Sequence, residues 1–415
     1  MSGAASGGIR DIVRQPTSVY AVAFAAVIAF MGIGLVDPIL PSIAKGLDAT
    51  PTQAELLFTS YLVVTGVAMF FTSWISSRIG AKRTLLIGLA FIVVFALAAG
   101  LSGSVDWVIG FRAGWGLGNA LFISTALATI VGAASGGTGA AIVLYEAALG
   151  LGIATGPLLG GLLGSWSWRG PFFGTSVLMA IGFIAIVTLL KSDAKSAAAA
   201  PAKISVLAPF KALAVPGLAV LAAAALFYNI AFFVLLAYSP FPLGLDAMGL
   251  GLTFFGWGLG VAITSVFVAP LLTARMPRTR VIWIALILLA AVLVAAALLI
   301  ESVPGLIACI VVGGLVLGVL NTVLTESVME ATDLPRSVAS SAYSGVRFLG
   351  GAIAPPVATE LANAFAASTP YWVAGGSALI AMVIVLAGRR ALRRVDGIAE
   401  TPLQEAQAIA TGDAA

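Results

Sequence analysis

The chain has 415 residues, of which 60% are hydrophobic and 9% are charged, and its formal net charge is +4. Soluble globular proteins carry about 25% charged residues, because their surface must be hydrated. The high mean hydropathy of +1.11 therefore excludes a water-soluble globular protein and predicts a membrane protein.

Apolar stretches of about 20 residues, enough for a helix to cross roughly 30 Å of hydrocarbon, follow one another along the chain. Barrel strands would instead show shorter segments of alternating polarity, and the sequence contains none. The first stretch is too long for the core of a signal peptide, so we expect it to remain as a helix. Twelve transmembrane helices are predicted, at about 18–41, 54–76, 84–103, 107–131, 139–163, 171–190, 214–238, 248–272, 281–301, 305–329, 338–362 and 371–388.

Lys and Arg residues gather in alternate connections between these stretches. With a cytoplasmic N-terminus, 17 of the 21 fall on the cytoplasmic side, and only Lys45 and Arg169 fall on the other side. Such an excess marks cytoplasmic loops, so the basic residues are a topology signal and we expect no nucleic-acid partner. We expect a multi-pass protein of the inner (plasma) membrane with both termini in the cytoplasm.

One long polar connection, 191–213, lies near the middle of the sequence. It is predicted to join an N-terminal six-helix bundle, residues 1–190, to a C-terminal bundle, residues 214–390. The remaining cytoplasmic tail, 391–415, is expected to be disordered because it is polar and lacks apolar periodicity.

The two halves share a spaced set of glycines and prolines. Gly114 and Gly118 match Gly314 and Gly318 at an offset of 200, and Gly152 matches Gly351 at 199. A common offset indicates two related bundles, the arrangement in which a transporter binds its substrate at the bundle interface.

A glycine- and proline-rich segment stands in the fifth stretch. Gly152, Gly156 and Gly160 lie four residues apart on one helical face, where a neighbouring helix can approach closely, and Pro157 permits a bend. With Gly161, the segment resembles the GxxxGPxxGG motif of the drug:proton antiporter branch of the major facilitator superfamily.

Two further segments resemble motifs of the same superfamily. The run from Arg112 to Ala120, RAGWGLGNA, is similar to RxxQGxGxA with Trp115 in place of glutamine. In that family the arginine is tied to proton coupling. The loop at 73–83 is similar to GxLaDrxGrk and keeps Arg78 and Arg83, but Ser77 stands where aspartate is usual. The resemblance spans roughly residues 18–390 and implies an all-α membrane protein of two pseudo-symmetric six-helix bundles.

Five charged residues of the apolar stretches are singled out as charges embedded in the membrane. A charge at the bilayer centre costs about 2.5–3.5 kcal/mol on insertion scales, so each is a functional candidate. We assign proton coupling to Asp37, Arg112 and Glu146. Glu326 and Arg347, with Arg78 and Arg83, are candidates for a cytoplasmic gate. The alternatives are that Asp37 lies at the headgroups, that Glu146 is a neutral hydrogen-bonded acid, and that Glu326 and Arg347 serve interfacial ion pairs.

The resemblance also implies that the first, fourth, seventh and tenth helices line a central cavity. Aromatic walls with a few amides suit amphipathic ligands. The candidates on these helices are Phe30, Asn119, Tyr228, Asn229, Phe232, Phe233, Asn321 and Thr325.

These features predict a monomeric, proton-coupled antiporter for multidrug efflux through the lipid bilayer, acting on small hydrophobic or amphipathic molecules by alternating access. The alternative is a facilitator-type exporter or flippase for one metabolite or lipid-linked substrate. The sequence has no histidine, one cysteine (Cys309) and no recognisable catalytic set, which argues against an enzyme, a metal site and any cofactor. A scaffold would need a sizeable soluble domain, which the connections are too short to supply.

Overall fold

The computed structural model describes residues 15–36, 39–133, 137–190 and 204–397. Within this part of the chain, ten helices are long and apolar enough to span a membrane, if α10 and α12 are counted with the short segments that continue them. They are α4 (Pro51–Ile79), α5 (Ala81–Leu101), α6 (Val105–Ala133), α7 (Gly137–Trp166), α8 (Gly170–Leu189), α10 (Pro216–Phe233), α12 (Ala247–Ile263), α14 (Arg278–Leu298), α15 (Val303–Glu330) and α17 (Thr369–Ala387).

Two further long helices complete the bundle. The helix α2 (Thr17–Gly34) is shorter than most of the others, and α16 (Arg336–Ala364) is less apolar because it carries Arg347 and Glu360. The prediction of about twelve helices is confirmed. The stretch 18–41 is wrong at its end, since α2 stops at Gly34 and a separate short helix, α3 (Leu40–Gly46), follows. Pro41 sits in the first turn of α3, where a missing N–H costs little.

Two of the predicted helices are interrupted by π-helical turns. The helix α10 continues through a π segment, Val234–Tyr238, into α11 (Pro240–Leu243). In the same way, α12 continues through Thr264–Val268 into α13 (Ala269–Thr273). Each π segment precedes a proline, whose ring conflicts with the carbonyl four residues earlier and so widens the turn.

The turn between α4 and α5 is a single glycine. The backbone of Gly80 has a φ of 87°, a left-handed conformation that favours glycine. At its other end, α4 begins with a capping box: Thr50 Oγ1 accepts from the Gln53 N–H at 3.2 Å, and Gln53 Oε1 accepts from the Thr50 N–H at 2.9 Å. These local signals fix both ends of α4.

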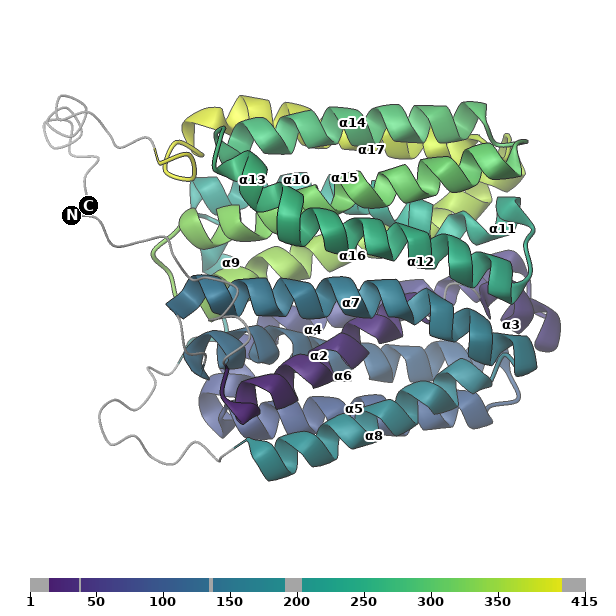
Figure 1. Cartoon of the computed structure of the whole chain (residues 1–415), viewed down its shortest axis with the longest axis horizontal. Coiled ribbons are helices and arrows are strands. Elements are labelled where there is room, and N and C mark those ends of the chain that lie inside the picture. The colour runs from purple at the N-terminus through teal and green to yellow at the C-terminus, as the bar shows by residue number, and fades with distance from the viewer. Residues whose placement is uncertain (1–14, 37–38, 134–136, 191–203, 398–415) are drawn as a thin grey trace, which may run out of the picture.

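The helices form two groups that follow the order of the chain. In Figure 1 the helices α2 to α8, coloured purple to teal, lie below the helices α10 to α17, coloured teal to yellow. We call the end of the bundle that carries Arg78, Arg83, Arg278, Arg336 and Arg390 the basic end, and the other the opposite end. The helices α3 and α11 lie at the opposite end (Figure 1).

Two long seams join the groups, one between α7 and α12 and one between α4 and α16. Along the first seam Gly161 meets Gly251, and Ala154 meets Gly258, so the helix backbones touch. Along the second, Thr59 Oγ1 donates to the Ala352 carbonyl at 3.3 Å, and the Thr72 and Ser341 hydroxyls lie 3.2 Å apart. Small and hydroxyl side chains are common where membrane helices pack closely.

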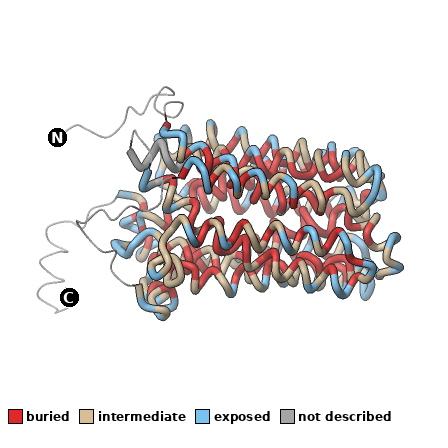
Figure 2. Tube along the Cα trace, turned by 90° about the horizontal axis from the view of Figure 1, so that it is seen from below, coloured by how far each residue is buried: buried red, intermediate tan, exposed pale blue. Residues whose placement is uncertain are grey.

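Apolar side chains cover the outside of the bundle as well as its interior. Figure 2 shows buried residues along the inward-facing sides of the helices. Leu101, Ile184 and Phe267 are more than half exposed. A surface of this kind suits hydrocarbon rather than water.

Candidate functional site

A narrow central cavity lies between the two groups of helices. Six helices supply its walls: α2, α7, α10 with its π segment, α12, α15 and α16. Its lining residues are Phe30, Gly34, Leu149, Ile153, Asn229, Phe232, Phe233, Leu236, Trp257, Asn321, Arg347 and Phe348. The cavity volume, counted as the space available to the centre of a water molecule, is about 30 Å³. Ligand pockets typically measure about 300–1,000 Å³, so in this conformation the cavity has room for a few waters but not for a drug-sized molecule.

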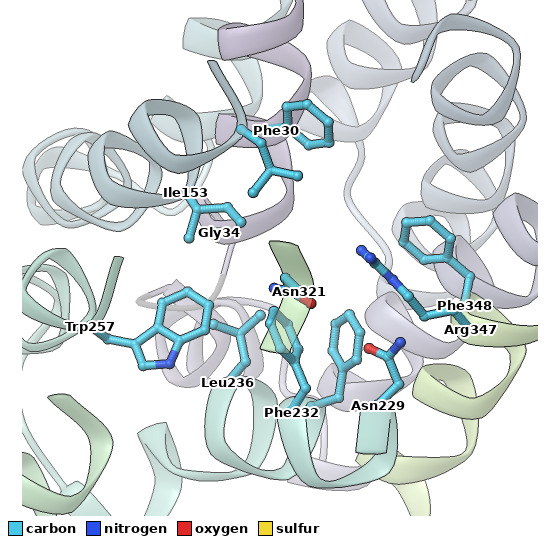
Figure 3. A pocket seen from close by; sticks show the side chains of 12 residues that line it. Phe30, Gly34, Ile153, Asn229, Phe232, Leu236, Trp257, Asn321, Arg347 and Phe348 are labelled. Atoms are coloured by element: carbon cyan, nitrogen blue, oxygen red, sulfur yellow. The ribbon is translucent and has the colours of Figure 1, made fainter. Parts of the chain in front are cut away.

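Polar groups in this cavity are few and come from three helices. Figure 3 shows the Arg347 guanidinium reaching into the cavity near Asn229 and Asn321. The aromatic rings of Phe232 and Trp257 meet edge to face, with centroids 5.4 Å apart. An aromatic wall with two amides and one guanidinium can bind an amphipathic, partly aromatic molecule and orient its polar group.

Five of the eight residues nominated for the cavity line it, namely Phe30, Asn229, Phe232, Phe233 and Asn321. Of the others, Thr325 lies nearer the basic end.

Asn119 and Tyr228 are buried and hydrogen-bonded, and neither lines the central cavity. The Asn119 amide donates to the Tyr61 hydroxyl, and the Tyr228 hydroxyl donates to Asn321 Oδ1 at 2.6 Å. The helix α6 supplies none of the residues of the central cavity itself, since Trp115 and Asn119 turn into the first group of helices and α7, α12 and α16 contribute instead. Ile123 and Leu127 of α6 line the next cavity toward the basic end.

Two more cavities continue from the centre toward the basic end. The first, of about 40 Å³, shares Phe30 and Arg347 with the central cavity and adds Tyr343 and Thr325. The second, of about 320 Å³, shares Thr325 and Ser340 with the first and includes Glu326 and Arg336. Shared walls make the three cavities one interrupted path between the two groups of helices.

Glu326 and Arg347, both assigned to a cytoplasmic gate, do not pair with each other in this structure. Glu326 Oε2 lies 3.6 Å from Arg278 Nε, at the start of α14, so this ion pair stays within the second group of helices. Arg347 lies further along α16 and lines the central cavity, more than two turns from the basic end. The sequence alone could not show which arginine pairs with Glu326, because α14 and α16 both reach the part of the bundle where Glu326 lies.

The other residues assigned to the gate lie on the surface of the basic end. Arg78 and Arg83 are exposed on either side of Gly80, and the Arg78 guanidinium lies 5.9 Å from the Trp74 ring. At the same end of the bundle, hydrogen bonding to Arg394 lowers the pKa of the exposed Asp333 carboxyl below its ordinary value.

Arg112 is fully buried in the first group of helices. Its guanidinium carbon lies 4.4 Å from the centre of the Tyr61 ring and 4.4 Å from the centre of the Trp115 ring. Trp115 also fills the space opposite Gly32 of α2, so Arg112 is held where α2, α4 and α6 meet. A cation between two aromatic faces is stabilised by their quadrupoles, and it lies away from lipid.

The two acidic residues assigned to proton coupling are outside the part that can be described. Asp37 falls in the gap at 37–38, and the side chain of Glu146, within α7, is also outside the described residues. Their roles stay predictions.

The glycine motif faces two helices at once. A Cβ on Gly152 or Gly156 would meet the backbone of α2, at Val27 and Met31 respectively, and a Cβ on Gly160 would meet Leu35, directly after α2. On the other side, Gly161 faces the Ala247 carbonyl and Gly251 of α12. The motif therefore lets α7 pack against α2 within its own half and against α12 across the seam.

Some of the glycines matched between the two halves of the sequence pack against equivalent helices, and others do not. Gly152 packs on α2 and Gly351 on α10, which are equivalent first helices of the two halves. Gly114 and Gly314 are not equivalent, since Gly114 faces α5 and Gly314 faces α12. Gly116, which faces the Tyr61 carbonyl of α4, is the counterpart of Gly314.

Sequence reasoning missed Trp257, Phe348 and Glu55. The two aromatics line the cavity from helices not expected there. Glu55 is fully buried although it stands near a helix end, where a charge usually meets water or headgroups. Its position as the one acid inside the stretch 54–76 was the available signal.

Comparison with known proteins agrees with this architecture. The sequence model of the Major Facilitator Superfamily matches residues 22–247 and 240–409. "Multidrug efflux protein YfmO" of Bacillus subtilis (strain 168) is 56% identical over 382 residues, which cover 92% of this chain and 95% of that protein. The "Tetracenomycin C resistance and export protein" of Streptomyces glaucescens is 29% identical over 195 residues, or 46% of this chain and 35% of that protein.

Solved structures share the fold at low sequence identity. The human organic anion transporter MFSD10 (TETRAN) superposes with a TM-score of 0.69 and 17% identity, over 89% of this chain and 99% of that one. A D-xylose-proton symporter gives a TM-score of 0.73 and 14% identity, over 89% and 96% of the two chains. The chain therefore belongs to the Major Facilitator Superfamily and is a multi-pass membrane transporter of small molecules rather than an enzyme.

Proposed function

We propose that this transporter exports small hydrophobic or amphipathic compounds, drugs among them, in exchange for protons. The observation that carries the proposal is the aromatic central cavity, where the walls from Phe30, Phe232 and Trp257 surround the polar groups of Asn229, Asn321 and Arg347. The name of the Bacillus subtilis relative, a multidrug efflux protein, points the same way.

The mechanism proposed is alternating access by rocking of the two six-helix halves, residues 1–190 and 214–390, about the cavity. The interrupted path of cavities toward the basic end supports a conformation that is closed at the opposite end. The basic end is then cytoplasmic, with both termini on that side of the plasma membrane, and a monomer suffices for transport.

Proton coupling is assigned to Asp37 and Glu146, with Arg112 as a fixed positive charge. Burial of Arg112 between Tyr61 and Trp115 supports an interior role rather than snorkelling to the headgroups. An acid that lies beside this positive charge in one conformation and is exposed to water in the other has a different affinity for protons in each. It therefore binds and releases a proton as the halves rock.

The experiment is transport in proteoliposomes that contain the purified full chain. A panel of lipophilic aromatic dyes, amphipathic antibiotics and one hydrophilic sugar is offered with and without an imposed pH gradient. We expect several lipophilic compounds to move against their gradients only when the pH gradient is present, with no movement of the sugar. Transport of a single metabolite with no lipophilic compound would favour the facilitator or flippase alternative, and transport unaffected by the pH gradient would contradict proton coupling.

A further inference from the structure

Glu55 is a carboxyl group buried in the seam between the two halves. It lies in the second turn of α4, near the opposite end, and its side chain has no exposed surface. The hydroxyl of Thr359, on α16, donates a hydrogen bond to Oε2 of Glu55. Since α4 belongs to the first half and α16 to the second, this bond closes one half against the other.

Nothing in the described residues compensates a negative charge on Glu55. The ion pairs in that part of the chain are Arg278–Glu326 and Arg394–Asp333. Oε1 of Glu55 has no hydrogen-bond partner there.

The titratable and charged groups around Glu55 come from four elements. Glu360 of α16 is a second carboxylate that acts on it, and the Tyr238 phenol faces it from the segment after α10. Lys45 of α3 is exposed, and Arg112 of α6 lies over Tyr61, further along α4. The charged group that acts on Glu55 is therefore a second carboxylate, and this like charge further disfavours the ionised form of Glu55.

A buried carboxylate without a cation is strongly disfavoured, because its hydration is lost and no partner replaces it. The protonated acid carries no charge, and it still accepts the hydrogen bond from Thr359. The closed seam therefore fits the neutral form of Glu55, whereas an ionised Glu55 would favour a seam opened to water.

We propose that Glu55 is a proton-controlled lock of the opposite end. The halves close there only when the Glu55 carboxyl group is protonated, and separation of α4 from α16 exposes it to water, where carboxyl groups are ionised at neutral pH. Each closure then takes up one proton from the opposite side. The lock rests on the alternating access of the proposed function, and it adds a protonation step outside the central cavity.

The test measures closure without any substrate. Spin labels are placed on the full chain in lipid nanodiscs at Ser165→Cys and Ala366→Cys, two exposed positions at the opposite end of different halves, in a Cys309→Ala background. Distances between the labels are recorded by double electron–electron resonance from pH 5 to pH 9. The variants are Glu55→Gln, which mimics the protonated acid, and Glu360→Gln as the matched control. Glu360 is exposed on the same seam and accepts a hydrogen bond from Thr52 at 3.3 Å.

In the otherwise unchanged chain, the ratio of open to closed populations is expected to rise with pH, by at most about tenfold per pH unit for one proton. Glu55→Gln should remain closed throughout. Glu360→Gln should still open with rising pH, at a somewhat lower pH than the unchanged chain, because the like charge that disfavours ionisation of Glu55 is gone. The proposal is overturned if Glu55→Gln opens with rising pH as the unchanged chain does, or if the unchanged chain shows no pH dependence. Because no transport is measured, an inactive substrate panel with a pH-dependent distance would reject drug export and leave the lock standing.

Discussion

The Tyr228 hydroxyl donates a 2.6 Å hydrogen bond to Oδ1 of Asn321, and it thereby ties α10 to α15 at the wall of the central cavity. Tyr228 is fully buried, while Asn321 lines the cavity. With its oxygen held by Tyr228, the Asn321 amide is left to offer its N–H groups to the cavity.

Tyr228→Phe should lower both stability and substrate affinity. The change leaves the Asn321 oxygen without its donor, which costs about 1–3 kcal/mol for a buried acceptor, and it frees the amide to rotate. The measurements are thermal unfolding in detergent and dye binding. Tyr371→Phe is the control, since it loses a 2.8 Å hydrogen bond to Ser239 away from the cavity. It should lower stability alone, and an equal loss of dye binding in both variants would contradict a specific role for Tyr228.

Phe232→Ala should weaken transport of aromatic compounds more than that of aliphatic ones. Phe232 supplies one wall of the cavity and packs edge to face on Trp257. An edge-to-face aromatic contact contributes about 0.5–1.5 kcal/mol beyond area burial, which corresponds to a several-fold loss of affinity. Phe267→Ala, which removes a ring that is 69% exposed, should leave the substrate profile unchanged. The readout is the ratio of transport rates for matched aromatic and aliphatic amphiphiles.

Gly156→Ala should reduce the yield of folded protein. Its Cβ would lie 2.5 Å from the Met31 carbonyl oxygen, so α7 would be pushed from α2. Overpacking of this kind costs about 1–3 kcal/mol. Gly110→Ala is the matched helical control, because nothing lies within 4 Å of its Cβ position. It should be neutral or stabilising in a fluorescence size-exclusion assay, and equal yields of the two variants would reject close packing at Gly156.

Arg112→Lys should impair transport although the charge is kept. A lysine ammonium cannot lie flat between the rings of Tyr61 and Trp115, and a desolvated cation–π contact is worth about 2 kcal/mol. Arg83→Lys, at an exposed position of the basic end, serves as the control. The midpoint of thermal unfolding and transport driven by a pH gradient are measured together. Unchanged transport in Arg112→Lys would show that only charge matters at this site.

Asp37→Asn and Glu146→Gln should each abolish or strongly reduce transport driven by a pH gradient, with expression unchanged. Each substitution keeps the shape of the acid but removes the exchangeable proton. Proton flux is followed with a pH-sensitive dye inside proteoliposomes during substrate movement. If a variant still couples substrate movement to proton flux, the acid replaced in that variant has no role in proton coupling.

Helix positions could be predicted closely, because each span needs its own run of apolar residues to cross hydrocarbon. The end of α2 was predicted less well. The π turns before Pro240 and Pro270 were not predicted at all, because they depend on local backbone geometry. The cavity residues on α10 could be nominated from their place in the helix order. Trp257 and Phe348 could not, because which face of α12 or α16 meets the cavity depends on how the halves pack.

The sequence alone determined that this protein crosses a membrane about twelve times and belongs with the facilitators, since hydropathy and the glycine–proline motif are properties of single segments. Only the tertiary structure decided that Arg347 enters the central cavity, that Glu326 pairs with Arg278, and that Glu55 is buried against Thr359. Those relations join residues up to 304 positions apart, and a linear pattern carries no record of which helix faces meet across a seam.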